Sequence, residues 1–343
     1  MIDVFQPRGL LRNPHVQSIL ASSGVRRFMF RKRRVEVERE SEEHILDCGD
    51  GVRLQGFLTR QHVADTPHAL AILLHGWEGS AQSSYVLNTA SRLLDDGCDV
   101  FRLNFRDHGA THHLNRELFH SCRIDEVVGA VAQIVQRFPT RPVVIGGFSL
   151  GGNFALRVAL RAPSAGIPLA WTFAVCPVIS PRAGLTSIEE APWFYEYYFM
   201  VKWRESLRRK QVLHPQSELF TPQQLRGSMR DLTRDMVLRH TDFGTLENYL
   251  DGYSIADATL AKLQVPATIL TAEDDPVIPI AEFRELTLAP ETELVITPHG
   301  GHCAFILDWS LQSWTDEFIV AHLHRALNAD SPREQGVRTA SAA

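Results

Sequence analysis

The residue with the clearest chemical potential is a serine inside a glycine-rich pentapeptide. The sequence GFSLG (147–151) matches the pattern G-x-S-x-G, directly after an apolar run and before a stretch with helical spacing. A strand that turns sharply into a helix holds Ser149 in a strained backbone conformation, which the small residues Gly147 and Gly151 permit. The helix N-terminus favours negative charge beside the serine. The pattern therefore predicts that Ser149 is a nucleophile.

A serine hydroxyl needs a base that takes its proton and a carboxylate that orients this base. After a G-x-S-x-G turn, the acid and then the base follow along the chain, each just past a later strand. The acidic cluster EDD (273–275) follows the apolar run VPATILTA (265–272). We favour Asp275 as the acid, because it directly precedes one proline and lies four residues before another. Asp274 is the second choice, and Glu273 is the third.

The candidate base lies in the segment HGGHC (299–303), which follows the apolar run ELVITP (293–298). His302 is the favoured base, because the two preceding glycines free the loop to bring this imidazole over the nucleophile. His299 lies closer to the strand, where a structural role is expected. Cys303 is interpreted as a small packed thiol rather than a redox residue.

The negative charge that develops on an attacked carbonyl needs two backbone N–H donors. One is expected from Leu150, the residue after the nucleophile, and the other from the loop after the apolar run ALAILLH (69–75). That loop has the sequence HGWEGS (75–80), so the N–H of Trp77 is the second candidate. The Trp77 side chain is expected to line a substrate cleft.

A histidine-rich segment, DHGATHH (107–113), with His120 beyond it, resembles a metal site. His108 and His112 would share a helical face, but Gly109 disfavours a helix there, and no H-E-x-x-H spacing is present. We interpret this segment as a loop at the edge of the site and expect no metal.

The elements that must position these residues alternate between strand and helix. Short apolar runs suited to buried parallel strands lie between stretches with helical spacing. This alternation predicts an α/β fold, with a mostly parallel central sheet flanked by helices. The core is expected at 43–175 and 256–327, and its first two strands form a hairpin around Gly49-Asp50-Gly51.

Three other segments do not show this alternation of strands and helices. Residues 176–255 are rich in aromatic and charged residues without a convincing buried strand, which predicts a helical lid inserted after the sixth strand. Residues 1–42 are interpreted as an irregular N-terminal segment. Its basic cluster, between residues 26 and 34, surrounds Phe28 and Met29, which leaves peripheral contact with anionic lipid open. The polar tail at 328–343 is predicted to be disordered.

The composition narrows the class of protein. The 343 residues are 44% hydrophobic and carry a formal net charge of -5, which argues against a nucleic-acid partner. The five scattered cysteines suit a reducing compartment and give no zinc site. Neither an export signal nor an apolar run long enough to span a bilayer is recognised, so a cytoplasmic location is expected. No cofactor is signalled, and the oligomeric state cannot be read from the sequence.

Six motifs together look like those of the YheT-type α/β hydrolases, bacterial relatives of mammalian α/β-hydrolase-domain esterases and phospholipases. The motifs are NPHVQS (13–18), HGWEGS (75–80), NFRDHG (104–109), GFSLGGN (147–153), DDPVIP (274–279) and GGHCAF (300–305). The resemblance implies an α/β-hydrolase fold and a triad of Ser149, Asp275 and His302, with Trp77 and Leu150 as oxyanion donors. This sequence differs from the family pattern at Asp107, where many relatives carry glycine.

What the resemblance implies about activity is hydrolysis of carboxylic esters, with short- to medium-chain acyl groups expected. The substrate is expected to be a small-molecule or lipid ester. Three alternatives remain open. An acyltransferase would pass the acyl group to an acceptor other than water, a phospholipase would act at a membrane surface, and a binding protein would carry an unused site.

Overall fold

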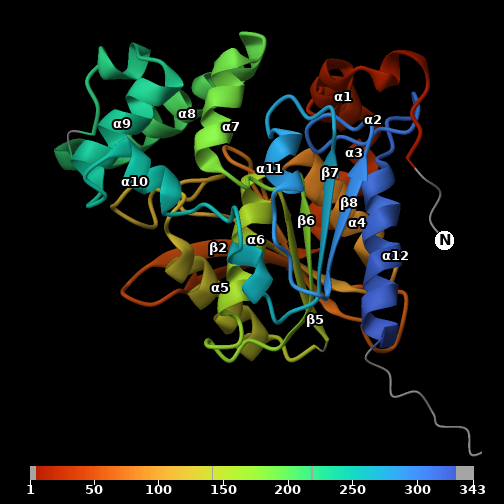
Figure 1. Cartoon of the computed structure of the whole chain (residues 1–343). Coiled ribbons are helices and arrows are strands. Elements are labelled where there is room, and N and C mark those ends of the chain that lie inside the picture. Colours follow the sequence, from red (N-terminus) through yellow and green to blue (C-terminus); the bar gives the residue numbers. More distant parts are fainter. Residues whose placement is uncertain (1–4, 141, 218, 330–343) are drawn as a thin grey trace, which may run out of the picture.

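The computed structural model describes residues 5–140, 142–217 and 219–329, and its centre is one eight-stranded sheet (Figure 1). The strands lie in the order β1-β2-β4-β3-β5-β6-β7-β8, and β2 runs antiparallel to both of its neighbours, β1 and β4. All other pairs are parallel. The strands are β1 (Ser41–Asp47), β2 (Arg53–Thr59), β3 (Leu70–Leu74), β4 (Asp99–Leu103), β5 (Val143–Phe148), β6 (Leu169–Val175), β7 (Ala267–Ala272) and β8 (Thr292–Thr297). The predicted α/β-hydrolase fold is confirmed.

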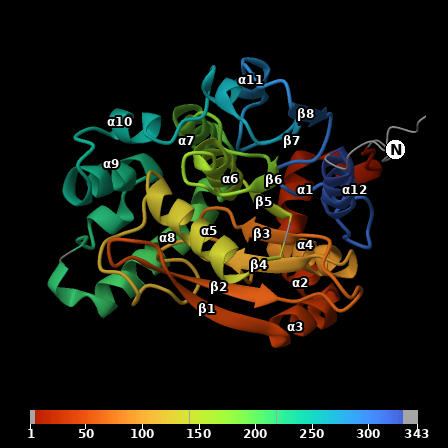
Figure 2. The same cartoon turned by 90° about the horizontal axis from the view of Figure 1, so that it is seen from below.

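Helices cover both faces of the sheet, as Figure 2 shows from below. Alternate residues of a strand point to opposite faces, so β3 sends Leu70, Ile72 and Leu74 into one core and Ala71 and Leu73 into the other. The first core is closed by α5 (Ile124–Arg137), α6 (Leu150–Arg161) and α11 (Ile280–Arg284), and the second by α4 (Ser84–Asp95) and α12 (Trp314–Ala329).

The segment between β6 and β7 forms a helical layer beyond the carboxyl ends of the strands (Figure 1). Its described part, 176–217 and 219–255, contains no strand. Its helices are α7 (Pro181–Glu190), α8 (Phe194–Leu213), α9 (Met229–His240) and α10 (Leu246–Asp251), with short 3-10 turns at Pro215–Ser217 and Gln224–Arg226. A separate apolar cluster around Trp203, Phe220 and Leu232 holds these helices together.

The N-terminal region is helical where an irregular segment was predicted, so that prediction is wrong. It contains η1 (Gly9–Arg12), α1 (Pro14–Ala21), α2 (Gly24–Met29) and α3 (Arg31–Arg39). The side chain of Asn13 accepts from two N–H groups of α1, and the hydroxyl of Ser23 accepts from the N–H of Arg26 in α2. Pro14 at the first position also favours a helix. These start signals were present in the sequence and were overlooked.

Two further expectations concern the C-terminal tail and helices that could span a membrane. From residue 330 onward, the tail that was predicted to be disordered lies outside the described residues. Within the residues that the structure describes, no helix is long and apolar enough to cross a membrane.

Candidate active site

Ser149 lies at the turn between β5 and α6, in the strained conformation that the sequence predicts. Its φ of 54° is in the left-handed region, which residues other than glycine rarely adopt. The turn depends on close backbone approach: a Cβ on Gly147 would lie 2.3 Å from the carbonyl oxygen of Gly151. A Cβ on Gly151 would lie 2.4 Å from the carbonyl oxygen of His75. Only glycine fits at either position without moving the backbone.

The sheet brings Ser149, His302 and Asp275 into one chain of hydrogen bonds. The hydroxyl of Ser149 lies 3.0 Å from Nε2 of His302, and Nδ1 of His302 lies 2.9 Å from Oδ2 of Asp275. Oδ1 of Asp275 also accepts from the N–H groups of Val277 and Ile278 at 2.8 and 3.0 Å. With Nδ1–H donated to the carboxylate, Nε2 carries the lone pair that faces the serine.

The other two acidic candidates have different partners. Asp274 accepts from the N–H of Gly301 at 2.9 Å and faces Nδ1 of His299 at 3.3 Å. Glu273 pairs with Arg284 at the surface. Asp274 therefore fixes the loop that carries the histidine, while Asp275 contacts the imidazole of His302 itself.

Electrostatics favour a charged imidazole beside Asp275. Burial alone would lower the pKa of His302, but the charges of Asp275 and Cys303 and the hydrogen bonds to both residues outweigh it and raise this pKa well above its ordinary value. The Asp275 side chain is fully buried, so little solvent screens the pair. This pair can therefore stabilise a proton taken up by His302.

The loop that carries Trp77 lies against the serine. A Cβ on Gly76 would lie 3.3 Å from Cβ of Ser149. The loop is fixed from outside, because the N–H of Gly76 donates to the hydroxyl of Tyr85 and the N–H of Glu78 donates to Nε2 of His108. Leu150 is the first residue of α6, where backbone N–H groups have no partner within the helix. Both predicted oxyanion donors thus belong to segments next to Ser149.

The histidine-rich segment holds loops together. Nδ1 of His108 donates to the carbonyl of Arg106, and Nε2 of His112 lies 2.8 Å from the hydroxyl of Ser206 on α8. Burial lowers the pKa of His108 to about 4 and that of His112 to about 3, so both are neutral. Each ring has its own hydrogen-bonding partner in the protein.

Asp107, the position at which this sequence differs from the YheT-type pattern, links this loop to the insertion. Its carboxylate lies 2.6 Å from Nζ of Lys210 on α8, and the side chains of both residues are almost fully buried. Lys210 also donates to the carbonyl oxygens of Asn115 and His112. The ion pair ties the helical layer to the core.

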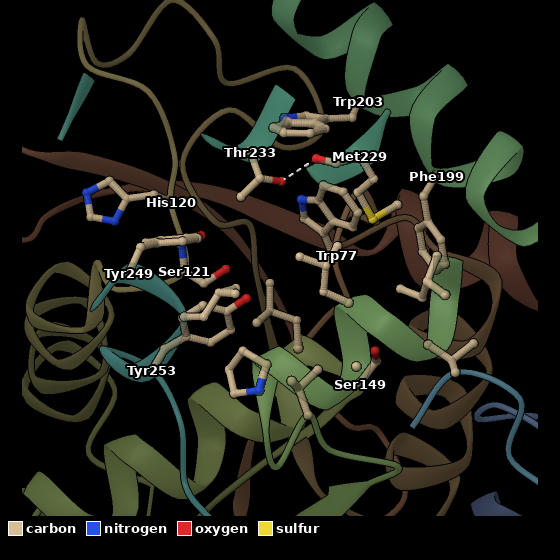
Figure 3. A pocket seen from close by; sticks show the side chains of 18 of the residues that line it. Trp77, His120, Ser121, Ser149, Phe199, Trp203, Met229, Thr233, Tyr249 and Tyr253 are labelled. Atoms are coloured by element: carbon tan, nitrogen blue, oxygen red, sulfur yellow. Dashed lines mark hydrogen bonds between the residues drawn. The ribbon is translucent and has the colours of Figure 1, made fainter. Parts of the chain in front are cut away.

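An apolar cavity of about 110 Å³ extends from Ser149 between the core and the insertion (Figure 3). Trp77 and the four helices of the insertion supply most of its wall, with Trp203, Phe199 and Met229 close to Trp77 in the figure. His120, Ser121, Tyr249 and Tyr253 provide polar groups farther from the serine. The cavity combines a reactive group with an apolar wall and a few polar groups, as small-molecule sites do.

Helix α1 supports the histidine loop, a role that the sequence reasoning missed. The N–H of His302 donates to the hydroxyl of Ser18 at 2.9 Å. The buried amide of Gln17 accepts from the N–H of Ile306 and donates to its carbonyl. His15 lies 3.0 Å from the hydroxyl of Tyr195 on α8. The motif NPHVQS was noticed as a motif, but its contact with a segment almost 300 residues later has no local signal.

The fold and the arrangement at the strand ends define an α/β hydrolase. A profile of the alpha/beta hydrolase family matches residues 71–318, and the chain belongs to this family. It is 25% identical to YheT of Escherichia coli (strain K12) over 270 residues, which are 76% of this chain and 78% of that protein. The predicted resemblance to the YheT-type hydrolases is confirmed.

Two further comparisons agree with this assignment. The chain is 28% identical to the pimeloyl-(acyl-carrier protein) methyl ester esterase of Nitrosomonas europaea over 261 residues, 72% of this chain and 92% of the relative. The esterase Pf2001 of Pyrococcus furiosus has the same fold, with a TM-score of 0.56 and 16% identity over 95% of this chain and 99% of that one. The chain is thus an enzyme of a family that contains esterases.

Proposed function

We propose that this protein is a serine esterase that hydrolyses carboxylic esters through an acyl-enzyme intermediate. The observation that carries the proposal is the continuous hydrogen-bonded chain from Ser149 through His302 to Asp275. Esterase activity in the names of its relatives supports the same reaction class. We assign Ser149 as nucleophile, His302 as general base and acid, and Asp275 as the carboxylate that orients His302.

In the first step, the hydroxyl oxygen of Ser149 attacks the ester carbonyl carbon while Nε2 of His302 accepts the proton. The carbonyl oxygen becomes negative and is stabilised by the N–H groups of Trp77 and Leu150. When the intermediate collapses, His302 returns the proton to the leaving alcohol, and the acyl group remains on Ser149. Water then attacks the acyl-enzyme with His302 again as base, which releases the acid and restores the serine.

The cavity supports an acyl site under a lid formed by residues 176–255. Its wall is apolar near Ser149, as an acyl site requires, and we expect it to take a short- to medium-chain acyl group. Because Trp77 contributes both its backbone to the loop beside Ser149 and its ring to the cavity wall, acyl binding and oxyanion stabilisation are coupled at this residue.

Hydrolysis of p-nitrophenyl esters from C2 to C16 by wild type and Ser149→Ala tests this proposal. We expect the variant to lose at least about 10³-fold in kcat, because removal of the nucleophile leaves only binding and the oxyanion donors. Labelling by a fluorophosphonate should occur in wild type and disappear in the variant. Full activity in Ser149→Ala would contradict the mechanism. Formation of a transfer product with added alcohols, in place of the free acid, would identify an acyltransferase instead.

A second candidate, action on lipid esters at a membrane surface, is favoured by the exposed side of α2 and α3. Phe28 is 74% exposed and Met29 is 48% exposed, and exposed basic residues surround them. Arg26, which the sequence placed in the same cluster, is buried and bonded to the carbonyl of Leu311. Sedimentation with anionic and neutral liposomes tests this candidate: binding to anionic vesicles that Phe28→Ser weakens supports it, and no binding contradicts it.

A further inference from the structure

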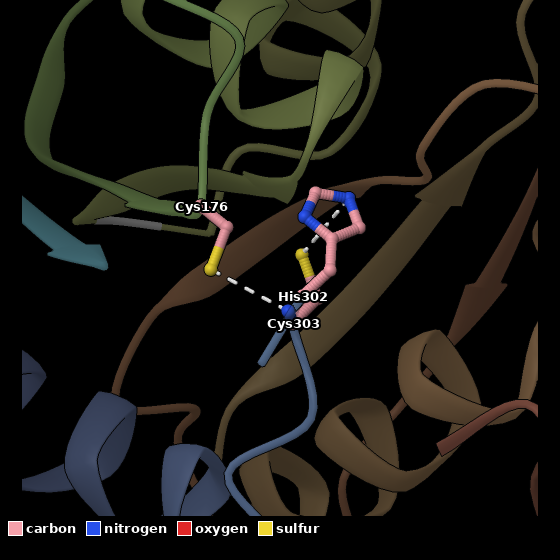
Figure 4. Close-up of side chains that lie close together, drawn as sticks. All are labelled: Cys176, His302 and Cys303. Carbon is pink, nitrogen blue, oxygen red and sulfur yellow. Dashed lines mark hydrogen bonds between the residues drawn. The ribbon is translucent and has the colours of Figure 1, made fainter. Parts of the chain in front are cut away.

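Two thiols lie beside the imidazole of His302 (Figure 4). Cys303 follows His302 in the chain, and its Sγ lies 3.9 Å from Nε2 of that ring. Cys176 directly follows β6, and its Sγ accepts the N–H of Cys303 at 3.4 Å. One ring nitrogen of His302, Sγ of Cys303 and Sγ of Cys176 all lie within 4.8 Å of one another. Within the described residues, this is the one group of three such side chains with its ligand atoms this close.

The backbone holds both cysteines in a conformation that ordinary packing does not require. Cys176 has a φ of 44° and Cys303 a φ of 58°, both in the left-handed region. Residues other than glycine rarely adopt this region, and such residues gather at functional sites. The thiols donate to the carbonyl of Gly301 at 3.9 Å and to the carbonyl of Val175 at 3.5 Å, and thiols are weak hydrogen-bond donors. Displacing these thiol protons therefore sacrifices little.

Two thiolates and one imidazole form a donor set for a thiophilic cation. Zn²⁺ binds Cys sulfur at about 2.3 Å and His nitrogen at about 2.0 Å in a tetrahedral geometry, which puts the ligand atoms about 3.5–3.8 Å apart. The 3.9 Å between Sγ of Cys303 and Nε2 of His302 is close to this value. Mg²⁺ and Ca²⁺ prefer oxygen ligands and do not match this set.

The surroundings of His302 also suit a metal ligand. Histidines that bind zinc usually donate their other ring N–H to a carboxylate, which fixes the ring and exposes the ligating nitrogen. Asp275 holds Nδ1 of His302 in this way at 2.9 Å. Two thiolates would neutralise the charge of a divalent cation, so the cation and its thiolates together add no net charge next to the buried carboxylate of Asp275.

We propose that Cys176, Cys303 and His302 form an inhibitory binding site for a thiophilic divalent cation such as Zn²⁺. On binding, the cation takes the place of the proton on each thiol and accepts the lone pair of Nε2, so two protons are released for each cation when the imidazole is neutral beforehand and three when it is protonated. A water molecule or the hydroxyl of Ser149 completes the tetrahedron. Nε2 can then no longer take the serine proton. The loss of hydrolysis rests on the proposed function, while the binding itself does not.

The experiment titrates metal-free protein with Zn²⁺ and, separately, with Co²⁺, whose thiolate bonds give a charge-transfer absorption band. We expect one cation per chain, a cobalt–thiolate band, and loss of ester hydrolysis that a chelator reverses. Cys303→Ala and Cys176→Ala should each bind at least about tenfold more weakly. Cys48→Ala, which removes a partly buried thiol elsewhere, is the matched control and should behave as wild type.

Metal content and the cobalt band are measured on Ser149→Ala as well, so the site is tested without any activity. One bound cation in this variant, lost when Cys303 is also replaced, supports the site even if no ester is hydrolysed. Equal binding by wild type and by the double variant Cys176→Ala/Cys303→Ala would overturn the proposal, as would hydrolysis by wild type that one equivalent of Zn²⁺ leaves unchanged.

Discussion

The two walls of the cavity are built from different interactions. On the core side, backbone geometry and hydrogen bonds fix the polar groups: the carboxylate of Asp275 accepts from two backbone N–H groups, and Ser149 occupies a strained turn. On the insertion side, α7 to α10 contribute mainly apolar side chains that pack on one another. Directional interactions leave little freedom, whereas apolar packing tolerates changes of shape and volume. The core wall is thus suited to holding the reactive groups in one geometry, and the insertion wall to accommodating substrates of different shape.

The largest loss of activity is expected when a carboxylate on the core wall is replaced by a group of the same shape. Asp275→Asn should lower kcat by about 10⁴-fold, because the amide cannot hold His302 in the required tautomer or stabilise its protonated form. Asp274→Asn is the matched control and should have a much smaller effect, since Asp274 contacts His299 and the backbone of Gly301. Steady-state kinetics on the best p-nitrophenyl ester measure both. Equal losses in the two variants would contradict the assignment of Asp275.

The pH profile adds a test of the same carboxylate. Asp275 raises the pKa of His302, and the reaction needs the neutral imidazole, so kcat/KM should fall as the pH drops through this pKa. Without the carboxylate charge the pKa decreases. The acidic limb of the remaining activity in Asp275→Asn should therefore move to lower pH, while in Asp274→Asn it should stay close to its wild-type position.

The buried ion pair between Lys210 and Asp107 is one of the links between the insertion and the core, and its loss should mainly affect stability. Lys210→Met leaves the Asp107 carboxylate buried without its charged partner, with the N–H of Phe119 still bonded to it, and should lower the free energy of unfolding by about 3–5 kcal/mol. Denaturant unfolding followed by tryptophan fluorescence measures this change.

The double variant Asp107→Gly/Lys210→Met tests whether the unpaired buried charge causes the loss of stability. It removes the unpaired charge, and glycine accepts the φ of 59° that Asp107 adopts here. We expect it to recover part of the lost stability. Recovery stays incomplete because Lys210 also donates to two backbone carbonyls. A double variant less stable than Lys210→Met would show that the buried charge is not the cause.

The core wall could be predicted from the sequence because its constraints are local. The glycines around Ser149 and the glycines before His302 each follow an apolar run, and parallel strands bring their carboxyl ends to one edge. Hydrogen bonds now connect the predicted serine, acid and base, although their catalytic roles stay predictions. The choice between Asp274 and Asp275 could not be settled by spacing, because both lie within reach of a histidine and only the loop conformation separates them.

The insertion and the N-terminal support could not be predicted in the same way. Aromatic residues occur all around α8, so periodicity does not show that Trp203 is buried while Trp193 is 75% exposed. That outcome depends on which neighbouring helix packs against each face. The contact between Ser18 and His302 joins segments 284 residues apart and leaves no pattern in either segment.

A smaller effect is expected on the insertion wall, where a change of volume should alter selectivity rather than chemistry. Ile188 on α7 lines the cavity and is only half-buried, so Ile188→Ala should cost little stability. Each methylene contact with the acyl chain that is lost corresponds to about 0.8 kcal/mol, or about fourfold in kcat/KM. The ester preferred by wild type should lose a factor of this order, and the optimum should move toward longer chains that fill the new space. Val201→Ala, on the exposed side of α8, is the control and should leave the profile unchanged.

Because the core wall is untouched, fluorophosphonate labelling of Ile188→Ala should keep its wild-type rate. If labelling slowed as much as hydrolysis did, the insertion would be shaping the reactive groups themselves, and the division between the two walls would fail.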